Sequence, residues 1–189
     1  MKPGSTLAAL VGSFELAQFD ADALKRYDLS ASGFWQSFTA VLFLVPLFAL
    51  ALYLQNTVTL RANRTPEPYD IALLIALLDW VVFTLLMVPI TRILDVRERY
   101  FAAMTVYNWC RPLAFAFFIP VFAVAATGMA GGTAQFALFY LSITLRSIFQ
   151  GYILHLTLKI GFGAIFAIIV IDILLGELII ITLRKTVLG

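Results

Sequence analysis

Ionisable side chains lie inside long apolar stretches of this chain, where a charge is costly. Two acids and two bases each lie near the middle of a separate stretch: Asp79, Arg111, Arg146 and Asp172. If the stretches cross a bilayer, each charge costs about 2.5–3.5 kcal/mol on insertion scales, unless it is paired or faces an internal cavity. Because consecutive elements are usually neighbours, Asp79 is predicted to meet Arg111. Arg146 is predicted to meet Asp172 for the same reason.

Glu177 joins these four residues, and we call the five together the charge cluster. It follows Asp172 by five residues, which is about 7.5 Å further along a helix. No base on a neighbouring stretch is its obvious partner. Burial would keep such a carboxyl neutral, or the side chain would face water near the outer leaflet.

Two kinds of function fit the charge cluster. Ion pairs inside a bundle can fasten helices together, as polar residues do in membrane proteins. The same residues could instead line a proton or ion path, or a pocket for a polar substrate. Equal numbers of each sign among the four central residues favour the first function, and the unpaired Glu177 favours the second.

The third apolar stretch contains Asn108, Pro112 and Pro120. Proline removes a backbone donor and kinks a helix, so we predict a kink or local unwinding between Asn108 and Pro120. Broken helices near the midplane often build transporter sites. Kinks without a function are also common, because neighbouring helices can satisfy the freed carbonyl groups.

Other chemistry has little support in the sequence. No group of histidine, cysteine and carboxylate residues has the spacing of metal ligands, and no glycine-rich phosphate loop is present. Ser147 and His155 are two helical turns apart, and nothing indicates a hydrolytic triad. We therefore expect no metal, no cofactor and no enzymatic activity.

The composition places the charge cluster in a membrane protein. Of the 189 residues, 62% are hydrophobic and 13% are charged, and the mean hydropathy is +0.96. Soluble domains are nearer half apolar and a quarter charged, so this apolar surface needs lipid to cover it. The net charge of +2 gives no support to nucleic-acid binding.

The expected fold is all-α, a bundle of about five transmembrane helices. A spanning helix needs about 20 apolar residues, and five stretches qualify: Gly33–Leu54, Tyr69–Pro89, Tyr100–Ala126, Thr133–Leu156 and Ile160–Leu183. Residues 33–189 would form this transmembrane domain. A barrel is not expected, because the stretches lack the period-two alternation of membrane strands.

Residues 1–32 are predicted to form an N-terminal cytoplasmic or interfacial segment with a short amphipathic helix. Leu7, Leu10, Val11 and Phe14 fall on one face at helical spacing. Such a helix could lie in the plane of the membrane interface or pack under the bundle. Both alternatives remain open from the sequence.

The basic residues predict the orientation. Seven lie on one side of the expected topology: Lys2, Lys25, Arg26, Arg92, Arg97, Arg99 and Lys159. Four lie on the other side: Arg61, Arg64, Arg184 and Lys185. This bias places the N-terminus in the cytoplasm and, with five spans, the C-terminus outside.

Four short stretches are similar to those of small proteobacterial inner-membrane proteins: Tyr27–Ser30, Gly33–Phe38, Tyr107–Trp109 and Ile169–Leu175. Those proteins resemble the YIP family, the Ypt/Rab-interacting membrane proteins. The resemblance implies five spans and a cytosolic N-terminus. The family's eukaryotic members work in vesicle traffic and bind small GTPases or one another, so the resemblance implies such contacts. The family's Asp-Leu-Tyr-Gly-Pro type motif is reduced here to Asp28-Leu29 followed by Ser30.

The function expected from the sequence is non-enzymatic. The chain would act through helix contacts, as a membrane organiser or as an accessory subunit of a larger assembly, because its loops are too small to hold a soluble domain. The alternative is a small transporter or channel subunit that uses the midplane charges. The expected partners are the lipid bilayer and either another membrane protein or a second copy of the chain.

Overall fold

The computed structural model describes residues 4–128 and 131–187, which leaves Lys2 and Gly189 outside the described residues. The described part is all-α. Its elements are α1 (Thr6–Ala17), η1 (Ala21–Arg26), α2 (Ala31–Ser37), η2 (Phe38–Ala40), α3 (Val41–Arg61), α4 (Tyr69–Ile93), η3 (Arg97–Arg99), α5 (Tyr100–Ala116), α6 (Ile119–Thr127), α7 (Gly132–Leu158) and α8 (Phe162–Val187). The expected fold class is confirmed.

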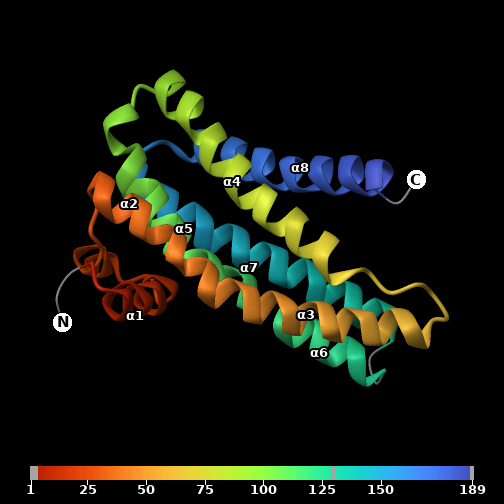
Figure 1. Ribbon diagram of the computed structural model, residues 1–189. Coiled ribbons are helices and arrows are strands. Elements are labelled where there is room, and N and C mark those ends of the chain that lie inside the picture. Colours follow the sequence, from red (N-terminus) through yellow and green to blue (C-terminus); the bar gives the residue numbers. More distant parts are fainter. Residues whose placement is uncertain (1–3, 129–130, 188–189) are drawn as a thin grey trace.

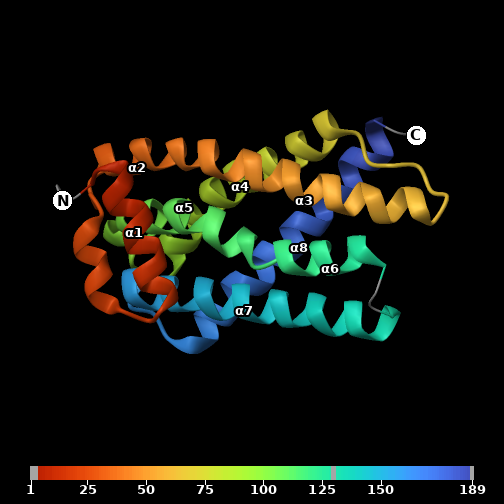
Figure 2. The ribbon, with the colours of Figure 1, turned by 90° about the horizontal axis from the view of Figure 1, so that it is seen from below.

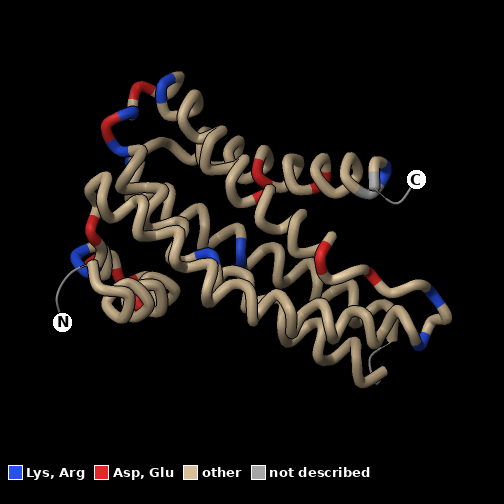
Figure 3. Tube along the Cα trace, in the orientation of Figure 1, with Lys and Arg blue, Asp and Glu red and all other residues tan. Residues whose placement is uncertain are grey.

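Five segments of these helices are long and apolar enough to cross a membrane. They are Ala31–Arg61, Tyr69–Ile93, Arg97–Thr127, Gly132–Leu158 and Phe162–Leu183. Figure 3 shows charged residues concentrated towards the ends of the bundle, with a small group in its interior. The protein is thus a multi-pass membrane protein in contact with lipid, and the interior group is the charge cluster.

Local residues set where the spans begin and end. The Ser30 hydroxyl accepts a hydrogen bond from the Gly33 backbone N–H at 3.3 Å and so caps the start of α2. Pro68 directly precedes α4, where a missing N–H costs nothing. Gly128, with a φ of 72°, ends α6 in the left-handed conformation that glycine adopts without strain.

Helix α5 lies at the centre of the bundle. It packs against α1, α2, α3, α4 and α7, whereas α8 packs mainly on α4 and α7. Figures 1 and 2 show α3, α6 and α7 running side by side, with α8 at an angle to them. This arrangement surrounds the middle of α5 with other helices, so polar groups on it can be buried away from lipid.

The third span is broken, as predicted. Helix α5 ends at Ala116 and α6 begins at Ile119. Pro120 lies in the first turn of α6, where its missing N–H and its ring prevent the α5 hydrogen-bond pattern from continuing. Pro112 lies inside α5, which continues past it. The break therefore lies at the C-terminal end of the predicted window, and Asn108 belongs to continuous helix.

Helix α1 joins the bundle through several small residues and through Leu16, which is fully buried in the core. Ala8, Ala9 and Gly12 are buried, and the Ser13 hydroxyl lies 3.1 Å from the carbonyl oxygen of Trp109 on α5. Of the apolar face predicted from the sequence, Leu7 and Phe14 are exposed, whereas Leu10 is half-buried and packs against the core. Figure 2 shows α1 running crosswise to the spans. The helix thus packs on the bundle and still presents large apolar side chains outward, which is the geometry of an interfacial helix.

An ion pair joins α1 to η1 within the N-terminal segment. The guanidinium of Arg26 binds both carboxylate oxygens of Glu15. This hydrogen bond holds the pKa of the Glu15 carboxyl below its ordinary value. Because a lowered pKa favours the folded state only while the carboxyl is ionised, the contact is lost as the pH falls through that pKa.

Candidate functional site

The four central residues of the charge cluster form two ion pairs. Arg111 on α5 donates to Asp79 on α4. Arg146 on α7 donates to Asp172 on α8 at 2.7 Å. These are the pairs that chain order predicted, and each one joins two spans that follow one another.

Asp172 is the more deeply buried acid, with 3% of the residue exposed. The Tyr107 hydroxyl donates to its Oδ2 at 3.3 Å, and the Gln150 amide donates to that hydroxyl at 2.7 Å. Both Tyr107 and Arg146 approach the same oxygen. Among the described residues, the other oxygen, Oδ1, has no hydrogen-bond partner, so one face of this carboxylate has unused capacity to accept a hydrogen bond.

Asp79 and Arg111 lie where three helices meet. The Arg111 guanidinium carbon is 6.0 Å from the centre of the Trp80 ring, within the range of a cation–π contact. A Cβ atom at Gly176 would lie 3.4 Å from Oδ1 of Asp79, so the glycine allows α8 to approach this acid closely. Small residues at helix contacts commonly serve this purpose in membranes.

A small cavity connects the two ion pairs. It has a volume of about 150 Å³ and is lined by side chains that include Asp79, Arg111, Arg146 and Gln150. The pairs therefore form one polar centre inside the bundle, and their charges can act on one another across a space large enough for water.

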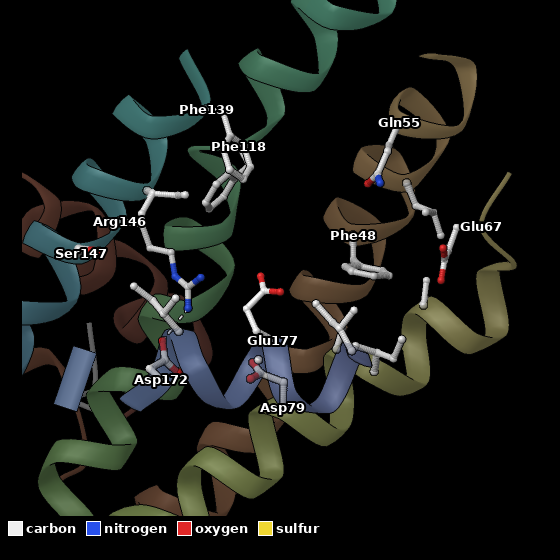
Figure 4. A pocket seen from close by; sticks show the side chains of 18 residues that line it. Phe48, Gln55, Glu67, Asp79, Phe118, Phe139, Arg146, Ser147, Asp172 and Glu177 are labelled. Atoms are coloured by element: carbon white, nitrogen blue, oxygen red, sulfur yellow. Dashed lines mark hydrogen bonds and ion pairs between the residues drawn. The ribbon is translucent and has the colours of Figure 1, made fainter. Parts of the chain in front are cut away.

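A larger cavity of about 390 Å³ opens beside this centre, between α3, α4, α7 and α8. Its lining extends from Asp79 and Asp172 near the middle of the bundle to Gln55 and Glu67 next to the loop that joins α3 and α4. We call it the lateral cavity, and Figure 4 shows its residues. It leads from the polar centre towards the end of the bundle that bears residues 62–68.

Glu177 lies in the wall of the lateral cavity. Figure 4 shows its side chain pointing into the space between Phe48 and Arg146. The residue is exposed. Its carboxylate makes no ion pair or side-chain hydrogen bond with the side chains that the structure describes. The residue for which the sequence indicated no partner thus faces the cavity.

The Asn56 side chain fixes the loop at the outer end of the lateral cavity. The Asn56 amide donates to the Glu67 carbonyl oxygen at 3.0 Å, and the Glu67 backbone N–H donates to the Asn56 side-chain oxygen at 2.9 Å. These two bonds fix the α3–α4 loop against α3. They place the Glu67 side chain in the cavity lining.

Sequence reasoning missed the role of Asn108 in joining helices. Its side-chain oxygen accepts from the Trp80 indole N–H at 2.7 Å, and its amide donates to the Ser37 hydroxyl at 2.9 Å. The contacts tie α5 to α4 and α2. An amide side chain inside an apolar stretch was the available signal. From the sequence, Asn108 was interpreted only as part of the predicted kink.

The break in the third span borders the lateral cavity. Phe118, at the break, is part of the cavity lining. Ser142 on α7 donates its hydroxyl proton to the carbonyl oxygen of Phe117 at 3.0 Å. The irregular backbone therefore lies against protein rather than lipid, which is the condition for such backbone at membrane depth.

Comparison with protein-family models, curated proteins and solved structures finds no match for this chain. Its function must therefore be inferred from the polar centre and the lateral cavity.

Proposed function

We propose that the protein binds a small solute in the lateral cavity and works as a small, non-enzymatic transporter or channel subunit. The observation that carries this proposal is Glu177, an unpaired carboxylate that faces a cavity inside a membrane-spanning bundle. Ionisable groups in such places usually belong to solute or proton paths. The two ion pairs next to it would then hold the helices that form the binding site.

A purely structural cluster would need neither the cavity nor Glu177. Two complete ion pairs already neutralise their charges and join four helices. An additional carboxylate inside the membrane raises the cost of insertion without fastening anything. A bound solute, or water that enters the cavity, would offset that cost.

The proposed orientation follows from the basic residues, with the N-terminus in the cytoplasm and the chain in a bacterial inner membrane. The α3–α4 loop would then face outward. Reporter fusions after Lys25 and Asp95 are expected to show a cytoplasmic location, and fusions after Asn63 and Gly131 an external one. The same location for Lys25 and Asn63 would contradict a first span between them.

Access to the lateral cavity can be tested with cysteine chemistry. The single native cysteine, Cys110, is buried and can be replaced with serine. In that background Ser147→Cys is expected to react with a membrane-impermeant thiol reagent added from outside, because Ser147 lines the cavity. A thiol must ionise to react, and it does so in water but not in lipid.

Leu145→Cys is the matched control for this experiment. Leu145 lies two residues away on α7, on nearly the opposite side of the helix, and is 45% exposed. It is expected to face lipid and to remain unreactive. Equal labelling of the two variants, or no labelling of Ser147→Cys, would argue against a hydrated cavity that opens outward.

A second candidate function is that of an organiser or accessory subunit that acts through helix contacts. It is favoured by α8, which packs mainly on α4 and α7 and leaves Leu174, Leu178 and Ile181 exposed. The resemblance to YIP proteins points in the same direction. Purification in mild detergent separates the candidates, because a stable partner supports this role and a monomer with an accessible Ser147→Cys supports solute binding.

A further inference from the structure

We infer that the occupant of the lateral cavity is an organic monocation with an apolar body, such as a protonated amine that carries an aromatic ring, and that the Glu177 carboxylate binds its charged end. This inference rests on the proposed solute-binding function. It adds the chemical class of the solute, the residue that selects it and the side chains that contact its body.

The charges that line the lateral cavity favour a cation. Four carboxylate residues contribute to its walls, against one base: Glu67, Asp79, Asp172 and Glu177, with Arg146 opposite. Arg111 lies behind Asp79 and neutralises it, and Arg146 neutralises Asp172. The Glu177 carboxylate has no ion-pair partner among the described residues, so it gives the walls a negative charge that attracts a cation and repels an anion.

Glu177 is the acid best placed to bind the cation. Asp79 and Asp172 are already paired with arginines, whereas the Glu177 side chain extends into the open space of the cavity. Asp172 also lines the cavity, but its Oδ1, which has no hydrogen-bond partner among the described residues, is buried. An ammonium group has three donors and no acceptor, so it can pair directly with the Glu177 carboxylate.

The remaining walls fit an apolar body. Phe118 and Phe139 lie with their ring centres 6.0 Å apart, and Phe48 lies across the cavity from them in Figure 4. Aliphatic side chains complete the lining: Leu52, Ile75, Ile143, Ile173 and Ile180. A few polar groups within mainly apolar and aromatic walls are typical of sites for small organic molecules, and about 390 Å³ lies within their usual range of size.

A bare metal ion fits these walls less well. Divalent cations and other hard ions take about six oxygen ligands. Among the residues that the structure describes, no three histidine, cysteine or acidic side chains are grouped so as to hold a metal ion. Aromatic faces, by contrast, stabilise organic cations through cation–π contacts. The combination of one free carboxylate and three phenylalanines therefore points to an organic cation.

Three probes that share one apolar body and differ in charge test the inference. Phenethylammonium is the cation, and phenylpropionate is the anion. Phenethyl alcohol is the neutral analogue, with a hydroxyl in place of the ammonium group. Binding to the purified protein in detergent is measured by titration calorimetry. We expect the cation to bind at least about tenfold more tightly than the neutral probe, since a hydrogen bond between an ammonium group and a carboxylate is about twice as strong as one between neutral groups. The anion is expected not to bind.

Glu177→Gln is the decisive variant, because it keeps the shape of the side chain and removes its charge. It is expected to lose the preference for the cation and to bind the neutral probe as before. Glu98→Gln is the control, since the Glu98 side chain is 70% exposed and belongs to the segment before α5. It is expected to bind all three probes as the unchanged protein does. Far-ultraviolet circular dichroism verifies that both variants are folded.

The outcomes separate this inference from the proposed function. Equal binding of cation and neutral probe, preference for the anion, or an unchanged preference in Glu177→Gln would overturn the inference. If no probe binds while Ser147→Cys remains reactive, the inference is also overturned. The proposed function would then stand, with a solute of another class. An unreactive Ser147→Cys together with no binding would overturn both.

Discussion

Replacing Asp172 with asparagine is expected to lower the free energy of unfolding by about 3 kcal/mol, the lower end of the range for removing one partner of a buried ion pair. Asparagine can still accept the Tyr107 hydrogen bond, but it cannot neutralise Arg146. The arginine would remain as an uncompensated charge, with 28% of its side chain exposed. Unfolding of the purified protein by a denaturing detergent in mixed micelles measures the change.

A second substitution tests the reason for this loss. Arg146→Gln in the Asp172→Asn background removes the orphaned charge and is expected to recover part of the stability. Asp22→Asn is the control for a solvent-exposed pair, since Asp22 and Lys25 are both 78% exposed. It is expected to cause no measurable change. If Asp172→Asn were no worse than Asp22→Asn, the pair would contribute nothing to stability.

The same double variant bears on function. If the pairs only fasten helices, a double variant that folds should keep the binding preference of the lateral cavity. If they take part in transport, it should fold and yet be inactive. Because the function we propose gives the Arg146–Asp172 pair the role of holding helices and gives Glu177 the role of binding the solute, it predicts the first result.

Asn108→Ala is expected to cost about 2–3 kcal/mol of unfolding free energy. The substitution would leave the Trp80 indole N–H without its acceptor. The Ser37 hydroxyl would lose the hydrogen bond from the Asn108 amide but would still donate to the Phe34 carbonyl oxygen. Each buried polar group that loses its partner costs about 1–3 kcal/mol. Hydrogen bonds between membrane helices lie towards the lower end of such values. The denaturing-detergent titration used for Asp172 measures the difference.

Thr105 provides a matched control on the same helix. Like Asn108 it is buried, but among the described residues its hydroxyl has no hydrogen-bond partner. Thr105→Val keeps the shape and removes an unsatisfied group, so the stability should be unchanged or slightly higher. Equal losses for Thr105→Val and Asn108→Ala would mean that packing rather than hydrogen bonding holds α5 in place.

Much of the fold could be predicted because it depends on properties that act locally. Whether a stretch enters a bilayer is decided by its own hydropathy and length, so the five spans follow from the sequence. The break in the third span depends on the missing N–H of Pro120. The partners of Arg111 and Arg146 follow from the cost of unpaired charge in lipid and from the short connections between consecutive spans.

The face through which α1 packs could not be read from the sequence. Helical spacing placed Leu7, Leu10, Val11 and Phe14 on one face that would meet either lipid or the bundle. In the structure Leu7 and Phe14 are exposed, and the buried residues of α1 are Ala8, Ala9, Gly12, Ser13 and Leu16. Gly12 is required there because a Cβ atom would lie 2.9 Å from the Tyr27 ring. The need for a glycine at this position depends on where the Tyr27 ring lies in the folded protein, which the sequence of α1 alone does not contain.

The sequence by itself determined that a multi-pass helical bundle carries acids and bases at midspan, because lipid penalises exposed backbone and unpaired charge wherever they occur. Only the tertiary structure decided that Asn108 joins three helices, that Gly176 brings α8 against Asp79, and that Glu177 faces a cavity. Each of these depends on how far helices are rotated about their axes and how closely they approach. Those quantities are set by the packing of all the spans together.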